Sequence, residues 1–272
     1  MTLLRERDAE DLQRQPIAVS RFSGRLVDWR VVLAVFLLVS ALYVRWHLRQ
    51  GWIPIDDGPV AETAHRVMQG QVPHRDFDEL YTGGLAYVNA AAFRLLGTNL
   101  WTLRLVLFGV FVAWVPVVFY IASRFVRPLT AASIGFLAVV WSLPNYPGAM
   151  ASWYNLFLAT FGIAALLHYL EVARVRWLFL AGVVGGMSFL VKVIGLYYIA
   201  GALLFLVFDA HIERASSAGG HERSSRGYEV FVTAALLVFV AALLLVVRSH
   251  IQVSEFVQFV LPGALLAALL VR

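Results

Sequence analysis

Long apolar runs alternate with shorter polar segments along most of the chain. The first run covers about Trp29 to Trp46, and further runs follow at about 100–123, 129–143, 152–170, 176–191, 194–208, 228–247 and 255–271. A helix needs about 20 mainly apolar residues to cross the hydrocarbon core of a bilayer, and these runs approach that length. The pattern predicts an all-α protein, a polytopic transmembrane helical bundle of about eight spans within residues 29–272.

Three polar segments interrupt this pattern. Residues 1–28 have mixed charge and no signal-peptide pattern, so we predict a cytoplasmic N-terminal tail. Residues 211–227 are rich in Ser, Gly and charged side chains, which is typical of a flexible linker, here a cytoplasmic one. The longest polar segment, residues 49–97, is the predicted first extracytoplasmic loop.

Two short amphipathic helices are predicted inside that loop. The first follows Asp56-Asp57-Gly58-Pro59, places Val60 and Ala64 on one face, and ends near Gly70 after about 11 residues. The second covers about Leu85 to Leu96. Because both are too short to span a bilayer, we expect them to lie at the membrane interface.

Composition supports a lipid environment. Hydrophobic residues make up 60% of the 272 residues and charged residues 14%, too little polar surface for a soluble domain of this size. There is no Cys, which excludes disulfides and thiolate metal sites, and the net charge of +5 does not suggest nucleic acid. Basic residues collect in cytoplasmic loops, which places the Arg-rich tail inside and loop 49–97 outside the cytoplasm. We therefore expect a multi-pass protein of the cell or inner membrane.

The acidic pair Asp56 and Asp57, directly after the first span, has two interpretations. In one, Asp57 caps the short helix and Asp56 is a solvated interface charge. In the other, a carboxylate at the lipid–water boundary acts as a general base, taking a proton from an attacking hydroxyl or amine while a phosphate leaves. Nearby cations would stabilise that leaving group.

Three basic residues are candidates for such a phosphate contact. Arg75 adjoins Asp76, and the two can also form a plain local ion pair. Lys192 can bind phosphate or extend to the interface. Arg104 lies one turn into the second span and needs a partner in lipid, either phosphate or one of the loop acids. Those acids are Asp76, Asp78 and Glu79.

Other polar residues give weaker signals. His65 and His74 have no recognised ligand spacing, so we expect no metal site and no cofactor. Asn155, with Trp153 and Tyr154, fits either a sugar-facing wall or an aromatic interface belt.

The order of these motifs resembles the C-type membrane glycosyltransferases, in particular the group similar to dolichyl-phosphate-mannose protein mannosyltransferases and aminoarabinose transferases. The likeness covers about residues 29–210. Its matching elements are the acidic pair, the short helix ending at Gly70, Pro73-His74-Arg75-Asp76-Phe77, Phe93, Gly97, Arg104-Leu105, and Gly182-x-x-Gly185-Gly186-x-x-x-Leu190-x-Lys192.

The resemblance implies transfer of a sugar from a polyprenyl-phosphate donor to an extracytoplasmic acceptor, with inversion at the anomeric carbon. It places Asp56 at the catalytic base and Asp57 at a second acid. It makes Arg75, Asp76, Arg104 and Lys192 candidates for substrate or phosphate binding. His74 replaces a common Tyr. The loop Ser142–Ser152 carries no acid where some relatives have one, only Asn145.

Two alternatives stay open. A transporter or flippase for lipid-linked sugars would place ionisable residues near the middle of several spans, and such residues are nearly absent here. A catalytically silent membrane subunit is the second. The chain ends at Arg272 directly after an apolar run, whereas enzymes of this kind are longer, which is compatible with a C-terminally truncated product. The sugar and the acceptor are not identified by the sequence.

Overall fold

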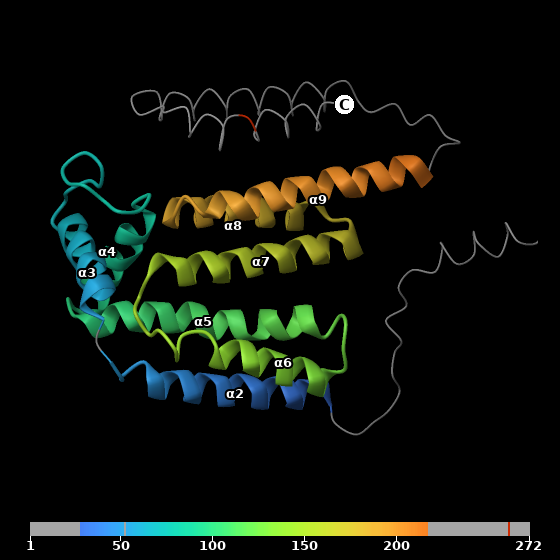
Figure 1. Ribbon diagram of the computed structural model, residues 1–272, viewed down its shortest axis with the longest axis horizontal. Helices are drawn as coiled ribbons and strands as arrows, with labels where there is room; N and C mark the ends of the chain where they lie inside the picture. Colours follow the sequence, from blue (N-terminus) through green and yellow to red (C-terminus); the bar gives the residue numbers. More distant parts are fainter. Residues whose placement is uncertain (1–27, 52, 217–260, 262–272) are drawn as a thin grey trace, which may run out of the picture. The chain divides into compact units, whose positions relative to one another are not determined.

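The computed structural model describes residues 28–51, 53–216 and Leu261 (Figure 1). Over these residues the chain forms helices and no strand, which confirms the all-α class. The helices are α2 (Trp29–His47), α3 (Pro54–Met68), α4 (Gly84–Leu96), α5 (Leu100–Ala122), α6 (Pro128–Val140), α7 (Ala151–Val172), α8 (Val175–Val191) and α9 (Gly195–Ser216). The chain divides into two compact units, Met1–Leu196 and Tyr197–Arg272, and the first unit contains α2 to α8.

Five helices of the first unit, α2, α5, α6, α7 and α8, run side by side, and α3 and α4 lie together at one end of them (Figure 1). Local chemistry fixes where α2 and α5 begin. The Asp28 carboxylate accepts a hydrogen bond from the Arg30 N–H, and the Asn99 side chain accepts one from the Thr102 N–H. Each cap satisfies one of the backbone donors that a helix start leaves free.

Three helices, α2, α5 and α7, have the length and apolar composition to cross a membrane, which indicates a membrane protein. The outward face of α2 is correspondingly apolar, since Val35, Leu38 and Leu42 are all more than half exposed. Helices α4, α6 and α8 are apolar but shorter. The total of about eight spans stays a prediction, because the runs at 228–247 and 255–271, apart from Leu261, lie outside the described residues, as does the tail 1–27.

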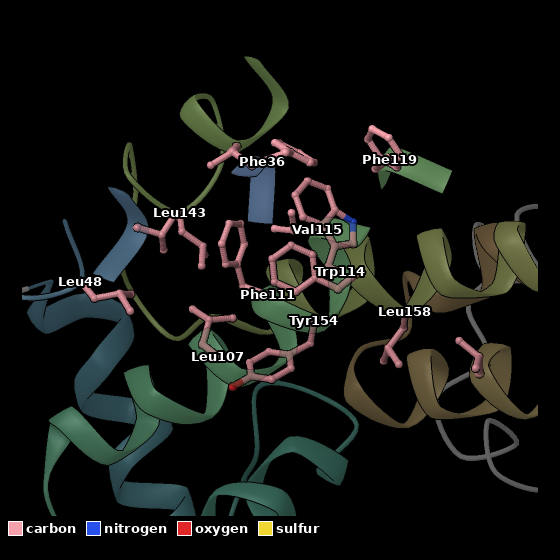
Figure 2. Packing of buried hydrophobic residues seen from close by; sticks show 14 of the residues in the cluster. Phe36, Leu48, Leu107, Phe111, Trp114, Val115, Phe119, Leu143, Tyr154 and Leu158 are labelled. Carbon is pink, nitrogen blue, oxygen red and sulfur yellow. The ribbon is translucent and has the colours of Figure 1, made fainter. Parts of the chain in front are cut away.

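Aromatic side chains fill the centre of the first unit (Figure 2). Phe111 and Trp114 of α5 meet Phe157 of α7, with ring centroids 6.2 and 5.1 Å from that of Phe157. Phe36 brings α2 into the same cluster and packs against Gly135 of α6, where a Cβ would lie 2.6 Å from its ring. This core holds the five parallel-running helices α2, α5, α6, α7 and α8 together, next to the end of the bundle that carries the polar residues.

Two predicted boundaries are wrong. Helix α3 begins at Pro54 rather than at the acidic pair, because the backbone N–H groups of Asp56 and Asp57 already bond to the Ile53 carbonyl. It is 15 residues long, with Pro59 inside it. The helical part of α9 reaches Ser216, so residues 211–216 of the predicted linker are helical, and the rest of that linker lies outside the described residues.

The end of α8 is closely joined to the start of α4. The Thr82 hydroxyl lies 2.8 Å from the Phe189 carbonyl oxygen and 2.6 Å from that of Leu190, two of the carbonyls that a helix end leaves unpaired. A Cβ on Gly84 would lie 2.4 Å from the Leu190 carbonyl oxygen, so only glycine fits. This contact sets the position of the start of α4 against the end of α8.

We expect Gly84→Ala to lower the stability of the fold. The added methyl meets backbone rather than a movable side chain, and overpacking of this kind costs about 1–3 kcal/mol. Gly186→Ala on α8 is the matched control, because a Cβ there meets nothing within 4 Å and replaces a helix-interior glycine, a gain of about 0.5–1 kcal/mol. Thermal melting in detergent should separate the two, and equal midpoints would contradict the close α4–α8 contact.

Candidate functional site

A buried ion pair organises the end of the bundle where α3 lies. Asp57 is 1% exposed and Arg104 is 6% exposed, and an Arg104 Nη2–Oδ2 distance of 2.7 Å joins them. The Arg104 Nη1 also donates to the Leu48 carbonyl at 2.8 Å, and the Ala149 N–H donates to Asp57 Oδ1 at 3.1 Å. Both charges are therefore hydrogen-bonded, and four separate parts of the chain meet at them.

The acid that pairs with Arg104 differs from the ones expected. The sequence offered the loop acids Asp76, Asp78 and Glu79, and the structure gives Asp57 instead. Both Asp57 oxygens are occupied, one by the guanidinium and one by a backbone N–H. Asp57 and Arg104 are thus placed inside the protein rather than on the pocket beside them.

Asp56 lies in different surroundings, although it is the adjacent residue. Successive helix positions differ by about 100°, so the two carboxylates of the first turn of α3 point in different directions. Asp56 is partly exposed, and its Oδ2 accepts a hydrogen bond from the Tyr146 hydroxyl. That hydrogen bond, followed by burial, raises the pKa of the Tyr146 phenol, so the hydroxyl keeps its proton and acts as a donor.

Asp56 lines a pocket of about 650 Å³ between α3 and the loop that follows it. Its lining is mixed, with apolar Ile55 and Leu80 next to polar and charged groups. Arg66 contributes a cation, but Glu62 pairs with it at 2.8 Å. The full lining is Ile55, Asp56, Pro59, Val60, Glu62, Thr63, Arg66, Phe77, Asp78, Glu79, Leu80 and Tyr81.

Tyr81 lines this pocket and also contacts Lys192. Burial, and then the charges of Asp56 and Glu79, raise the pKa of the Tyr81 phenol. The Lys192 Nζ atom lies 5.1 Å from the centroid of the Tyr81 ring, within cation–π range. The same ammonium donates to Ser152 Oγ at 3.0 Å, at the start of α7. A carboxylate and an ammonium are therefore both grouped around one tyrosine at this end of the bundle.

Asn155 contributes to this arrangement from inside the bundle. Its Nδ2 donates to Ser188 Oγ at 3.0 Å and lies 3.4 Å from the Lys192 carbonyl, and the side chain is buried. It therefore fixes the end of α8 that carries Lys192. A sugar-facing wall at Asn155 stays a prediction.

Arg75 and Asp76 form the local ion pair that the sequence offered as one alternative, at 2.8 Å and exposed. Asp76 also accepts the Val72 N–H at 2.8 Å, and the Arg75 and Val72 bonds lower its pKa to about 2. Neither residue lines the pocket. The Asp76–Val72 bond closes the turn that begins the loop, and the ion pair with Arg75 lies in solvent.

The two histidines also serve the loop and α3. His74 has a positive φ of 63° and its Nε2 lies 2.8 Å from the Tyr81 carbonyl oxygen, while His65 bonds Gln69 at 2.9 Å. Among the residues that the structure describes, no group of three or more His, Asp or Glu side chains could hold a metal ion.

Tyr81, Tyr146 and Ser152 are the site residues that the sequence did not indicate to us. Loop Ser142–Ser152 carries no acid where some members of the resembled family have one, and in the structure the Tyr146 phenol of this loop reaches Asp56. Tyr146 stands between Pro144 and Pro147, and such a proline-flanked tyrosine opposite an acidic pair is the signal that could have indicated it.

Comparisons with known proteins yield no match, whether to a family model, to a curated protein or to a solved structure. A proposal of function therefore depends on the site and on the sequence motifs.

We expect Arg104→Met to destabilise the protein strongly, because it leaves the Asp57 carboxylate buried without its cation. Breaking one side of a buried ion pair costs about 3–5 kcal/mol. Arg75→Met is the matched control, since Arg75 pairs with its carboxylate in solvent and its loss should leave the melting temperature unchanged. The yield of monodisperse protein and its melting in detergent provide the measurement. Equal behaviour of the two variants would show that the Asp57–Arg104 pair does not support the fold.

Proposed function

We propose that this chain is an integral-membrane glycosyltransferase that moves a sugar from a polyprenyl-phosphate donor to an extracytoplasmic acceptor, which is a protein, a lipid or a cell-envelope glycan. One observation carries the proposal. The Asp56 carboxylate lines a pocket at the end of an apolar helix bundle, and the Lys192 ammonium lies over Tyr81, a residue of that same pocket.

These two groups supply the chemistry that such a transfer requires. The acceptor hydroxyl gives its proton to Asp56 as its oxygen forms a bond to the anomeric carbon. The bond from that carbon to the phosphate oxygen breaks, and the polyprenyl phosphate leaves with the bonding electrons. Attack opposite to the leaving group inverts the anomeric centre. Lys192 stabilises the negative charge on the departing phosphate.

The surroundings of Lys192 suit an anionic lipid. Its ammonium meets Ser152 in the first turn of α7, where unpaired N–H groups and the helix dipole favour negative charge. A stripe of exposed apolar residues on α8 leads toward it, namely Phe179, Val183, Met187 and Leu190. A donor lipid that is hydrophobic along most of its length and charged at one end matches an apolar stripe that leads to an ammonium.

In this proposal Asp57 and Arg104 hold the site in shape rather than touch substrate, since their polar atoms are taken by each other and by backbone groups. Arg75 and Asp76 shape the loop. The base is Asp56 alone, and the phosphate contact is Lys192.

The first test follows lipid-linked sugars in cells. A strain lacking this gene should accumulate one polyprenyl-phosphate sugar, detected by mass spectrometry, and wild-type protein should clear it. We expect Asp56→Asn to leave it uncleared while the protein is made and folded normally, because an amide cannot take the proton. Asp28→Asn is the matched control, since Asn caps α2 as well as Asp does.

Two outcomes would contradict the proposed transferase activity. An unchanged lipid profile in the deletion strain favours a silent subunit. Full clearance by Asp56→Asn excludes Asp56 as the base and favours a transporter of lipid-linked sugars.

The second test concerns the phosphate. We expect Lys192→Gln to lower the apparent affinity for the accumulated donor by about 10- to 100-fold in isolated membranes, since a charge-assisted hydrogen bond contributes about 1.5–3 kcal/mol. Lys192→Arg should retain part of that affinity. If Lys192→Gln binds donor as the wild type does, Lys192 merely reaches the interface and the phosphate contact lies elsewhere.

A further inference from the structure

The segment between α6 and α7, residues 141–150, supplies one wall of the site and is held firmly. Ser142 Oγ donates to the Val139 carbonyl at 2.7 Å, and Asn145 Nδ2 donates to the Val140 carbonyl at 2.9 Å. Leu143 and Ala149 are fully buried, and the Ala149 N–H bonds the ion-paired Asp57. The backbone around Tyr146 is therefore fixed on both sides.

Tyr146 is fixed in the same way as its segment. Its carbonyl accepts a hydrogen bond of 3.0 Å from Trp153 Nε1, at the start of α7. Gly148 lies against its ring, since a Cβ there would be 3.3 Å from Tyr146 Cε1. Its hydroxyl bonds one oxygen of Asp56, the pocket carboxylate.

We propose that Tyr146 is a positioning residue for Asp56, holding Oδ2 so that Oδ1 faces the acceptor hydroxyl and receives its proton. This inference rests on the proposed transferase function. A neutral donor suits the task better than a cation, because it orients the carboxylate without cancelling the negative charge that makes it a base. The adjacent Asp57 shows the contrast, since its guanidinium partner neutralises it.

The test compares two hydroxyl deletions in isolated membranes supplied with the donor found in the lipid profile. We expect Tyr146→Phe to fold as the wild type, to turn over about 10- to 100-fold more slowly and to keep the wild-type KM for the donor. The readout is the split between turnover and KM, because a carboxylate that is no longer held loses its orientation toward the acceptor hydroxyl while donor binding is unchanged. A purely structural role would raise KM or lower the yield of folded protein and leave turnover of the folded enzyme as in the wild type.

Tyr154→Phe is the matched control. Tyr154 belongs to the buried cluster of Figure 2, and its hydroxyl has no hydrogen-bond partner among the described residues. Removing it should change neither turnover nor KM. Trp153→Phe is a second variant, which removes the hydrogen bond to the Tyr146 carbonyl and keeps the Tyr146 phenol. It should lower turnover less than Tyr146→Phe does.

The outcomes separate this inference from the proposed function. If Asp56→Asn is inactive but Tyr146→Phe matches Tyr154→Phe in turnover, the base stands and the role of Tyr146 is wrong. A raised KM with wild-type turnover also overturns it, since Tyr146 would then only shape the pocket. If wild-type protein clears no donor, the proposed function fails and this inference fails with it.

Discussion

Asp57 and Arg104 meet inside the protein, where neither has water to stabilise its charge. Removing two ions from water costs several kcal/mol each, and the cost is offset only where geometry and further hydrogen bonds are good. Here the Leu48 carbonyl and the Ala149 N–H complete the pair. The residue that follows α2, the first turn of α3, the start of α5 and the segment before α7 must therefore come together for either charge to be tolerated.

Placement of the pocket follows from that constraint. Once the first turn of α3 is anchored by Asp57, the neighbouring Asp56 is held about 100° away around the helix, toward Tyr146 and the pocket. A second set of contacts fixes the other charge, because Thr82 and Gly84 tie the loop and α4 to the end of α8 just before Lys192. Two independent attachments thus bring two opposite charges to the same end of the bundle.

The sequence predicted the features that depend on local pattern. Apolar runs located α2, α5, α6, α7 and α8 to within a few residues, and an amphipathic pattern located α4. The adjacency of Arg75 and Asp76 was enough to suggest their ion pair. The need of Arg104 for a partner was also evident, but its choice of Asp57 depends on how α3 meets α5. The positions of Tyr81 and Tyr146 depend likewise on contacts between segments distant in sequence. Periodicity carries no information about such contacts.

The loop between α3 and α4 is held by contacts at both of its ends. The Asp76–Val72 bond closes its first turn, His74 reaches the Tyr81 carbonyl, and Thr82 bonds to α8. Asp78 and Leu80 lie between these attachments, exposed and on the pocket. Substitutions at these two positions change the side chains that line the pocket and remove none of the attachments. In the proposed transferase, the choice of substrate can therefore change through a few loop side chains without any change in the scaffold that holds them.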